Sequence, residues 1–144
     1  MTPNRPWRRP VCLAVGAALA LAGCTSRPAA ETAGTAARDF YRAVAAADGA
    51  GACALLAPAT AEALEDDAGL PCDEAILDGD VGETLTERAQ DGSTPSGRVA
   101  GRQAQVTLPT DVLFLTVSGS RWLITAAGCD PRPPRPYDCV LEGA

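Results

Sequence analysis

The chain has 144 residues, which is enough for one domain of ordinary size but not for two. Hydrophobic residues make up 47 % of it and charged residues 21 %, a balance typical of globular proteins that excludes disorder throughout. All twelve basic residues are arginine, and the sequence contains no histidine. It therefore has no imidazole to act as a general base or zinc ligand, and no Ser-His or Cys-His dyad. The net charge of −6 argues against nucleic acid as a partner, because phosphate binding depends on clustered basic side chains.

The first 24 residues have the three zones of a secretory signal. Three arginines lie within the first nine residues, residues 11–22 are almost wholly apolar, and the sequence Leu-Ala-Gly-Cys follows at 21–24. A twelve-residue helix falls well short of a bilayer core of about 30 Å, so a transmembrane anchor is disfavoured. The sequence Leu-Ala-Gly-Cys at 21–24 resembles the lipobox of bacterial lipoproteins. That resemblance implies a signal peptide at 1–23 and lipidation of the thiol of Cys24.

Cleavage before Cys24 removes three arginines and no acid, so the remaining chain carries a formal charge of −9. Such a domain is repelled by an anionic membrane, and the acyl chains on Cys24, rather than a basic patch, must hold it there. We therefore expect a lipid-anchored protein on the extracytoplasmic face of the cell membrane. Arg8 and Arg9 suggest half of a twin-arginine signal, but the residues after them match poorly, so the export route stays open between that system and the general secretory one.

Four cysteines remain outside the signal and the lipid site, and in an oxidising compartment they predict two disulfides. Three connectivities are possible. We favour Cys53 with Cys72 and Cys129 with Cys139, because each bond then closes a short loop within one half of the domain. A structural metal site would need more closely paired thiolates, and the CxxC signature of a redox pair is missing. We predict no metal and no cofactor.

Helical patterns fill the first half of the chain. Residues 24–34 are small, polar and proline-bearing, which predicts a flexible tether before a single domain at 35–144. A helix is expected from Thr35 to Asp48-Gly49, and shorter helical segments on either side of Pro58 and after Pro71. The apolar residues expected on the buried faces of these helices are Ala37, Phe40, Tyr41, Val44, Cys53, Leu56, Ala63, Leu64, Cys72, Ala75 and Ile76.

Strand patterns fill the second half. Residues 78–97 are rich in Gly, Asp, Ser and Thr, and within them 83–90 is compatible with either a weak helix or an irregular strand. The period then changes to two residues at 103–108, and 112–117 is apolar on both faces, as in a central strand. A third strand is expected at 121–127. Helices followed by an antiparallel meander predict the α+β class.

The chain also resembles a known class of proteins. The resemblance lies in the lipobox, in ARDFYRAVAAADGAGACALLAP, in LPCDEAIL and in VLFLTVSGSRWLITAAGCDPRPPRPYDC, and it covers residues 24–139. It is to small secreted lipoproteins of the actinobacterial type, from high-GC Gram-positive bacteria, a largely uncharacterised group. The fold that this implies is the cystatin-like or nuclear-transport-factor-like cone, with helices in the hollow of a curved antiparallel sheet. The resemblance brings no catalytic residue with it.

Several charged segments have simple structural explanations. The acidic run at 78–83 lacks the closing acid of a calcium loop and is expected to be a solvated turn, and the acids at 65–67 a solvated face. The segment PRPPRP at 131–136 predicts a stiff extended cover over the sheet, with Arg132 and Arg135 as an alternative anion-binding spot. Arg98, Arg102 and Arg121 are expected on or beside exposed strand faces, as solvated partners of the surplus acids.

Three functions from different classes fit these observations. The first is a non-catalytic envelope lipoprotein, a binding or accessory module that binds a partner protein or stabilises a membrane complex through an exposed face or edge of the sheet. The second is a carrier of a small apolar ligand in the hollow of the cone. The third is an isomerase-like or cyclase-like enzyme, which requires a carboxylate in the hollow with a raised pKa. Most acids fall in turns and at helix ends, so Asp39, beside the apolar stripe of the first helix, is the one candidate. We favour the first function and predict no catalytic residue.

Overall fold

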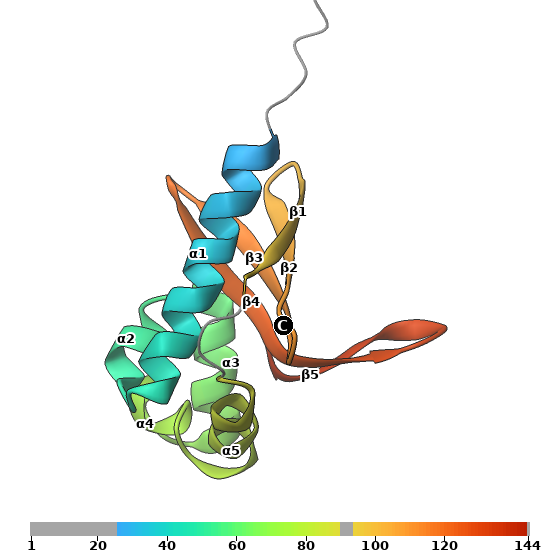
Figure 1. Cartoon of the computed structure of the whole chain (residues 1–144). Helices are drawn as coiled ribbons and strands as arrows, with labels where there is room; N and C mark the ends of the chain where they lie inside the picture. The colour runs from blue at the N-terminus through green and yellow to red at the C-terminus, as the bar shows by residue number, and fades with distance from the viewer. Residues whose placement is uncertain (1–25, 90–93, 144) are drawn as a thin grey trace, which may run out of the picture.

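The computed structural model describes residues 26–89 and 94–143 of the chain (Figure 1). Within them, five helices precede five strands, which makes the domain α+β, as predicted. The proposed signal peptide and Cys24 lie outside the described residues. The helices are α1 (Ser26–Ala45), α2 (Gly49–Cys53), α3 (Pro58–Ala68), α4 (Cys72–Ala75) and α5 (Gly79–Arg88). The strands are β1 (Ser96–Ala100), β2 (Gln103–Thr107), β3 (Val112–Ser118), β4 (Arg121–Arg132) and β5 (Arg135–Glu142).

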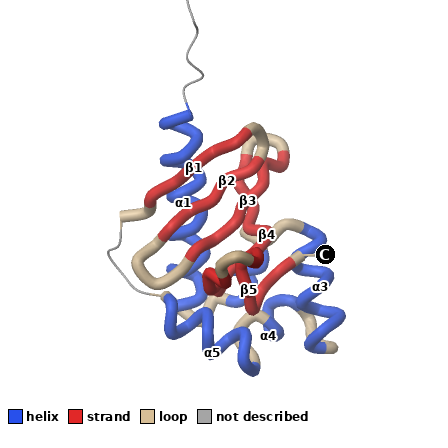
Figure 2. Tube along the Cα trace, turned by 90° about the vertical axis from the view of Figure 1, so that its right-hand side faces the viewer, coloured by secondary structure: helices blue, strands red, loops and turns tan. Residues whose placement is uncertain are grey.

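The five strands form one antiparallel meander in the order β1-β2-β3-β4-β5. The strand with apolar residues on both faces, β3, is central, as its sequence predicts. Figure 2 shows the sheet in front of α1, with the shorter helices below, so that the helices cover one face and the other is left facing outward. We call the uncovered side the outer face of the sheet.

The core lies between the helices and the inner face of the sheet. Large side chains from both layers are fully buried there: Phe40, Ile76, Leu85, Val106, Leu113, Leu115, Ile124 and Leu141. These side chains pack together in one hydrophobic cluster that joins the two layers.

Helix α1 begins earlier than the sequence suggests. Residues 26–34, expected to be part of a flexible tether, form its first turns, and Ala33 is completely buried. The indole nitrogen of Trp122 on β4 donates a hydrogen bond to the hydroxyl of Thr32 at 3.1 Å. Small residues in this segment give it the composition of a linker. The same small residues let the helix approach the sheet closely.

The first disulfide joins two short helices. Cys53 at the end of α2 is bonded to Cys72 at the start of α4, which is the pairing favoured from the sequence. Helix α3 between them has Pro58 as its first residue and ends at Gly69 in the left-handed conformation, φ 67°. Neither α2 nor α4 is long enough to be stable alone, so packing and the covalent bond hold them.

The segment at 78–97 contains α5 and the first two residues of β1, and of the two alternatives expected at 83–90 the structure has the helix, as far as Arg88. The acidic run at 78–83, expected as a solvated turn, lies at the start of α5, and Leu85 on that helix is completely buried. A Cβ on Gly82 would come within 2.2 Å of the carbonyl carbon of Leu77, so the glycine that weakens the helical pattern is required for close packing. Strand β1 is an edge strand whose alternation is too short to be seen in the sequence.

The proline-rich segment forms the tip of a hairpin rather than a cover over the sheet. Strands β4 and β5 stay paired as far as Arg132 and Arg135, and Cys129 faces its disulfide partner Cys139 across the ladder. Figure 1 shows this hairpin extending away from the body of the domain. The prolines concentrate at the exposed end of the hairpin, where missing N–H donors cost little.

Candidate functional site

The most densely bonded polar group in the described structure is Asp111, in the turn between β2 and β3. The sequence predicts only a turn at this position. In the structure the side chain of Asp111 is 0 % exposed, in contrast to the solvated acids expected elsewhere. A carboxylate without solvent requires compensation by hydrogen bonds and by positive charge.

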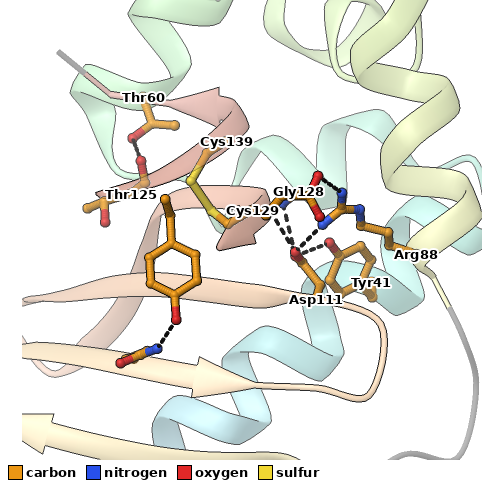
Figure 3. The surroundings of a disulfide bond; sticks show 11 residues. Tyr41, Thr60, Arg88, Asp111, Thr125, Gly128, Cys129 and Cys139 are labelled. Atoms are coloured by element: carbon orange, nitrogen blue, oxygen red, sulfur yellow. Dashed lines mark hydrogen bonds and ion pairs between the residues drawn. A yellow bond between two sulfur atoms is a disulfide. The ribbon is translucent and has the colours of Figure 1, made fainter. Parts of the chain in front are cut away.

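Asp111 obtains that compensation from three other parts of the chain (Figure 3). One carboxylate oxygen, Oδ1, accepts hydrogen bonds from the guanidinium of Arg88 at 2.9 Å and from the backbone N–H of Cys129 at 2.7 Å. The other, Oδ2, accepts from the hydroxyl of Tyr41 and from the backbone N–H of Gly128 at 2.9 Å. We call these five residues the Asp111 cluster.

The five members of the Asp111 cluster come from four different elements. Tyr41 comes from α1, Arg88 from the last turn of α5, and the two N–H groups from the part of β4 that carries the second disulfide. Arg88 also forms an ion pair with the exposed carboxylate of Asp130 at 2.8 Å. The cluster therefore ties two helices, a turn and a strand together at one point.

The protonation of Tyr41 and Arg88 follows from these surroundings. Burial, and next the negative charge of Asp111, raise the pKa of the Tyr41 phenol well above its ordinary value of about 10. Burial by itself lowers the pKa of Arg88, but the hydrogen bonds to Asp130 and Asp111 outweigh it and raise the pKa above its usual range. At neutral pH the tyrosine thus donates its proton to the hydrogen bond, and the arginine carries its charge.

This arrangement suits a structural role better than proton transfer. Both oxygens of Asp111 already accept two hydrogen bonds, and the side chain has no contact with solvent. A general base needs a free lone pair within reach of the substrate, and a general acid needs a pKa near neutrality. The Asp111 carboxylate has no free lone pair, and the pKa of the Tyr41 phenol is far from neutrality.

Asp39, the one acid singled out from the sequence, lies elsewhere. Its side chain is 42 % exposed and pairs with Arg42 one turn along α1 at 2.7 Å, so it does not point into the core. Its neighbour on the helix, Tyr41, is buried as expected and is the residue that reaches the cluster. The helical period placed Asp39 beside the apolar stripe, but the side chain turns outward.

The other charged residues singled out from the sequence are spread over the surface. Glu65 accepts a hydrogen bond from the backbone N–H of Cys72, and Asp66 and Asp67 are exposed. Arg132 pairs with Asp138 at 3.3 Å within the hairpin. In the described part of the chain no group of three or more His, Cys, Asp or Glu side chains is placed to hold a metal ion.

The outer face of the sheet carries a shallow apolar groove. Phe114 on β3 and Tyr137 on β5 are half-buried and pack edge to face with ring centroids 5.2 Å apart, and Gln105 donates a hydrogen bond to the Tyr137 hydroxyl at 3.2 Å. A groove of about 370 Å3 lies beside these rings, and its other lining residues are Thr125, Ala126, Pro136, Cys139, Glu142 and Gly143. No helix of the described chain covers this face (Figure 2).

Charge is divided unequally between the two halves of the domain. Residues 26–88, which form the helices, carry thirteen acids and four arginines, whereas residues 94–143, which form the sheet, carry four acids and five arginines. Because one of the four acids in the sheet half is the buried Asp111, the exposed charges there are mainly positive. The groove on the outer face therefore lies on the less acidic side of the molecule.

Comparison of the chain with protein-family models, with curated proteins and with solved structures found no match. None of the helices among the described residues is both long and apolar enough to cross a membrane.

The Asp111 cluster predicts a large loss of stability in Asp111→Asn. This change removes the negative charge and leaves Arg88 and the donors around it imperfectly paired, so we expect the free energy of unfolding to fall by about 3 to 5 kcal/mol. Asp39→Asn removes an exposed ion pair and should cost less than about 1 kcal/mol. Denaturant titration of both variants measures the difference, and equal losses would contradict the role of the cluster.

The raised pKa of Tyr41 predicts a dependence of stability on alkaline pH. The folded state keeps the phenol protonated above pH 10, whereas the unfolded state loses that proton at about pH 10. Stability is therefore fully present below pH 10 and declines by up to about 1.4 kcal/mol per pH unit above it. Urea titrations between pH 9 and 11 measure this slope. In Tyr41→Phe the contribution should vanish, and a slope unchanged by that substitution would refute the assignment.

Proposed function

We propose that this protein is a lipid-anchored component of the cell envelope whose folded domain acts as a non-catalytic binding module. The lipobox at 21–24 supports the anchor, with Cys24 as the acylated residue at the extracytoplasmic face of the membrane. The observation that carries the binding role is the uncovered outer face of the sheet with its aromatic groove.

The groove suits a protein partner of definite chemistry. The half-buried rings of Phe114 and Tyr137 offer apolar contact area at a low cost in side-chain entropy, as aromatic residues do at many interfaces. Arg135 is exposed next to Pro136, which lines the groove, and Glu142 is part of the lining, so charges of both signs border the rings. We infer that the partner is a protein that places an apolar side chain against the two rings.

The structure of the core and of the buried carboxylate favours this function over the two alternatives. A carrier needs an apolar cavity between helices and sheet. Phe40, Leu85 and Ile124 are fully buried there, and the pocket of about 250 Å3 between α3, α5 and β5 is bordered by the acids Asp67, Asp78, Asp80 and Glu142. An isomerase-like or cyclase-like enzyme needs an available carboxylate in the same place. Asp111 is buried there, but all of its hydrogen-bonding capacity is used within the protein.

We also propose a cystatin-like or nuclear-transport-factor-like cone for this domain. Helices packed on one face of an antiparallel meander are compatible with the cystatin-like or nuclear-transport-factor-like cone. Relatives of that cone place their chemistry in the hollow, whereas the groove here is on the opposite, outer face. We therefore propose that this chain uses the cone as a scaffold for a surface.

The anchor is tested by Cys24→Ala. Without the thiol, no diacylglyceryl group can be attached, so we expect the protein either in the medium or as an uncleaved precursor. Fractionation of cells followed by mass measurement distinguishes these forms from the wild type. A variant that stayed tightly bound to the membrane at the mature size would contradict the lipid anchor.

The binding surface is tested with a photocrosslinking amino acid. Placed at Leu123, which lies on the outer face of the sheet, it should give a discrete adduct with one envelope protein in intact cells. The matched control is Glu62 on α3, which is exposed on the acidic side and should give no such adduct. Phe114→Arg should abolish the adduct formed at Leu123. Adducts of the same pattern from both positions would refute the proposed surface.

A further inference from the structure

We propose that the domain lies directly on the bilayer through the end at which α1 begins, and that this end contacts anionic lipid headgroups. The contacting end consists of the first turns of α1 together with the neighbouring strand β1 and the β1–β2 turn. This inference rests on the proposed lipidation of Cys24, and it concerns how the anchored domain is oriented.

The chain between the lipidated cysteine and the first helix is very short. Helix α1 begins at Ser26, two residues after Cys24. Even a fully extended chain advances at most about 3.6 Å per residue, so the two Cα atoms lie within about 7 Å of each other. An eleven-residue flexible tether would instead separate the lipidated cysteine from the start of the folded domain by about 18 Å on average. The beginning of α1 is thus confined to the level of the headgroups.

The beginning of α1 cannot move apart from the rest of the domain. A Cβ on Gly97 of β1 would come within 2.8 Å of the carbonyl oxygen of Ala30, so helix and strand are in close contact there. The buried Ala33 and the hydrogen bond from Trp122 to Thr32 fix the next turn to the sheet. Whatever holds the first turn at the membrane therefore holds the whole domain.

The exposed charges at this end suit an anionic surface. Arg27 is on the first turn of α1, Arg98 is on β1 beside it, and Arg102 is in the β1–β2 turn; all three are exposed. Glu31 on the next turn offsets one of these charges. Figure 1 shows the β1–β2 turn beside the first turns of α1, with α3, α4 and α5 at the opposite end.

The acidic helices do not oppose this orientation. Twenty residues of α-helix span about 30 Å, so the far end of α1 and the short helices beside it lie several Debye lengths from the lipid phosphates. Repulsion between those acids and the membrane is screened by physiological salt. A domain with net negative charge can therefore rest on an anionic surface through its positive end.

A single intrinsic probe reports the distance to the membrane. Removal of the signal takes Trp7 with it and leaves Trp122 as the one tryptophan of the mature chain. The indole contacts Thr32, six residues or about 9 Å along α1 from its start. Energy transfer from Trp122 to dansyl groups on lipid headgroups therefore reports whether the domain is held at the surface.

The first arm of the experiment lengthens the chain between the lipidated Cys24 and helix α1. The lipidated protein is reconstituted into phosphatidylcholine vesicles, with and without twenty Gly and Ser residues inserted between Thr25 and Ser26. Such a linker has an average span of about 25 Å, so we expect transfer to fall at least about twofold. Equal transfer with and without the linker would overturn the close attachment.

The second arm tests the charges in the chain with the linker, whose domain is free to leave the surface. Phosphatidylglycerol vesicles should raise its transfer above that in phosphatidylcholine. Arg27→Glu combined with Arg98→Glu should remove the increase, whereas Arg38→Glu combined with Arg135→Glu makes the same charge change elsewhere and should preserve it. Equal transfer in the two lipids, or equal losses in the two double variants, would overturn the contact with anionic headgroups.

Failure of the anchor itself is recognised separately. Mass spectrometry of the N-terminal peptide shows whether Cys24 carries acyl chains before either arm begins. If it carries none, the proposed anchor fails, and with it the close attachment. If it is acylated and the vesicle-bound protein gives one of the contrary results above, the orientation is wrong while the proposed function stands.

Discussion

The burial of one carboxylate determines how the parts of this domain fit together. Asp111 is inaccessible to water, and its charge is stable only while Tyr41, Arg88 and two backbone N–H groups of β4 surround it. A displacement of α1, α5 or β4 by a few ångströms would leave the charge without a partner, which is far more costly than losing an apolar contact. The cluster thus selects one relative arrangement of elements that hydrophobic packing alone would hold less specifically.

Burial can be predicted from the sequence where a single hydrophobic period decides the structure. Phe40, Tyr41 and Val44 follow the helical period, and Ala104 and Val106 the strand period, so their burial could be predicted. The burial of Asp111 could not be predicted in this way. Asp111 lies in a segment with the sequence of a turn, directly before the central strand, and its hydrogen-bond partners are 17 to 70 residues away. An acid directly before the most apolar strand was the one available signal.

Two boundaries were missed for the same physical reason. The small residues at 26–34 and the prolines at 131–136 have weak local preferences for regular structure, so they read as a tether and a cover. In the structure tertiary contacts override those preferences: Ala33 is buried against the sheet, and the Cys129–Cys139 bond spans a paired hairpin. Local propensity is a weak guide where a segment packs against a large surface.

The wide sequence separation within the Asp111 cluster also bears on the fate of incomplete chains. Tyr41 belongs to the first helix, whereas Gly128 and Cys129 belong to the last hairpin, so a chain truncated before β4 contains the acid but not the N–H groups that neutralise it. Such a fragment cannot close around Asp111 without burying an unsatisfied charge. It would stay open and accessible to proteases, so the chain becomes resistant to cleavage only once the last hairpin has formed.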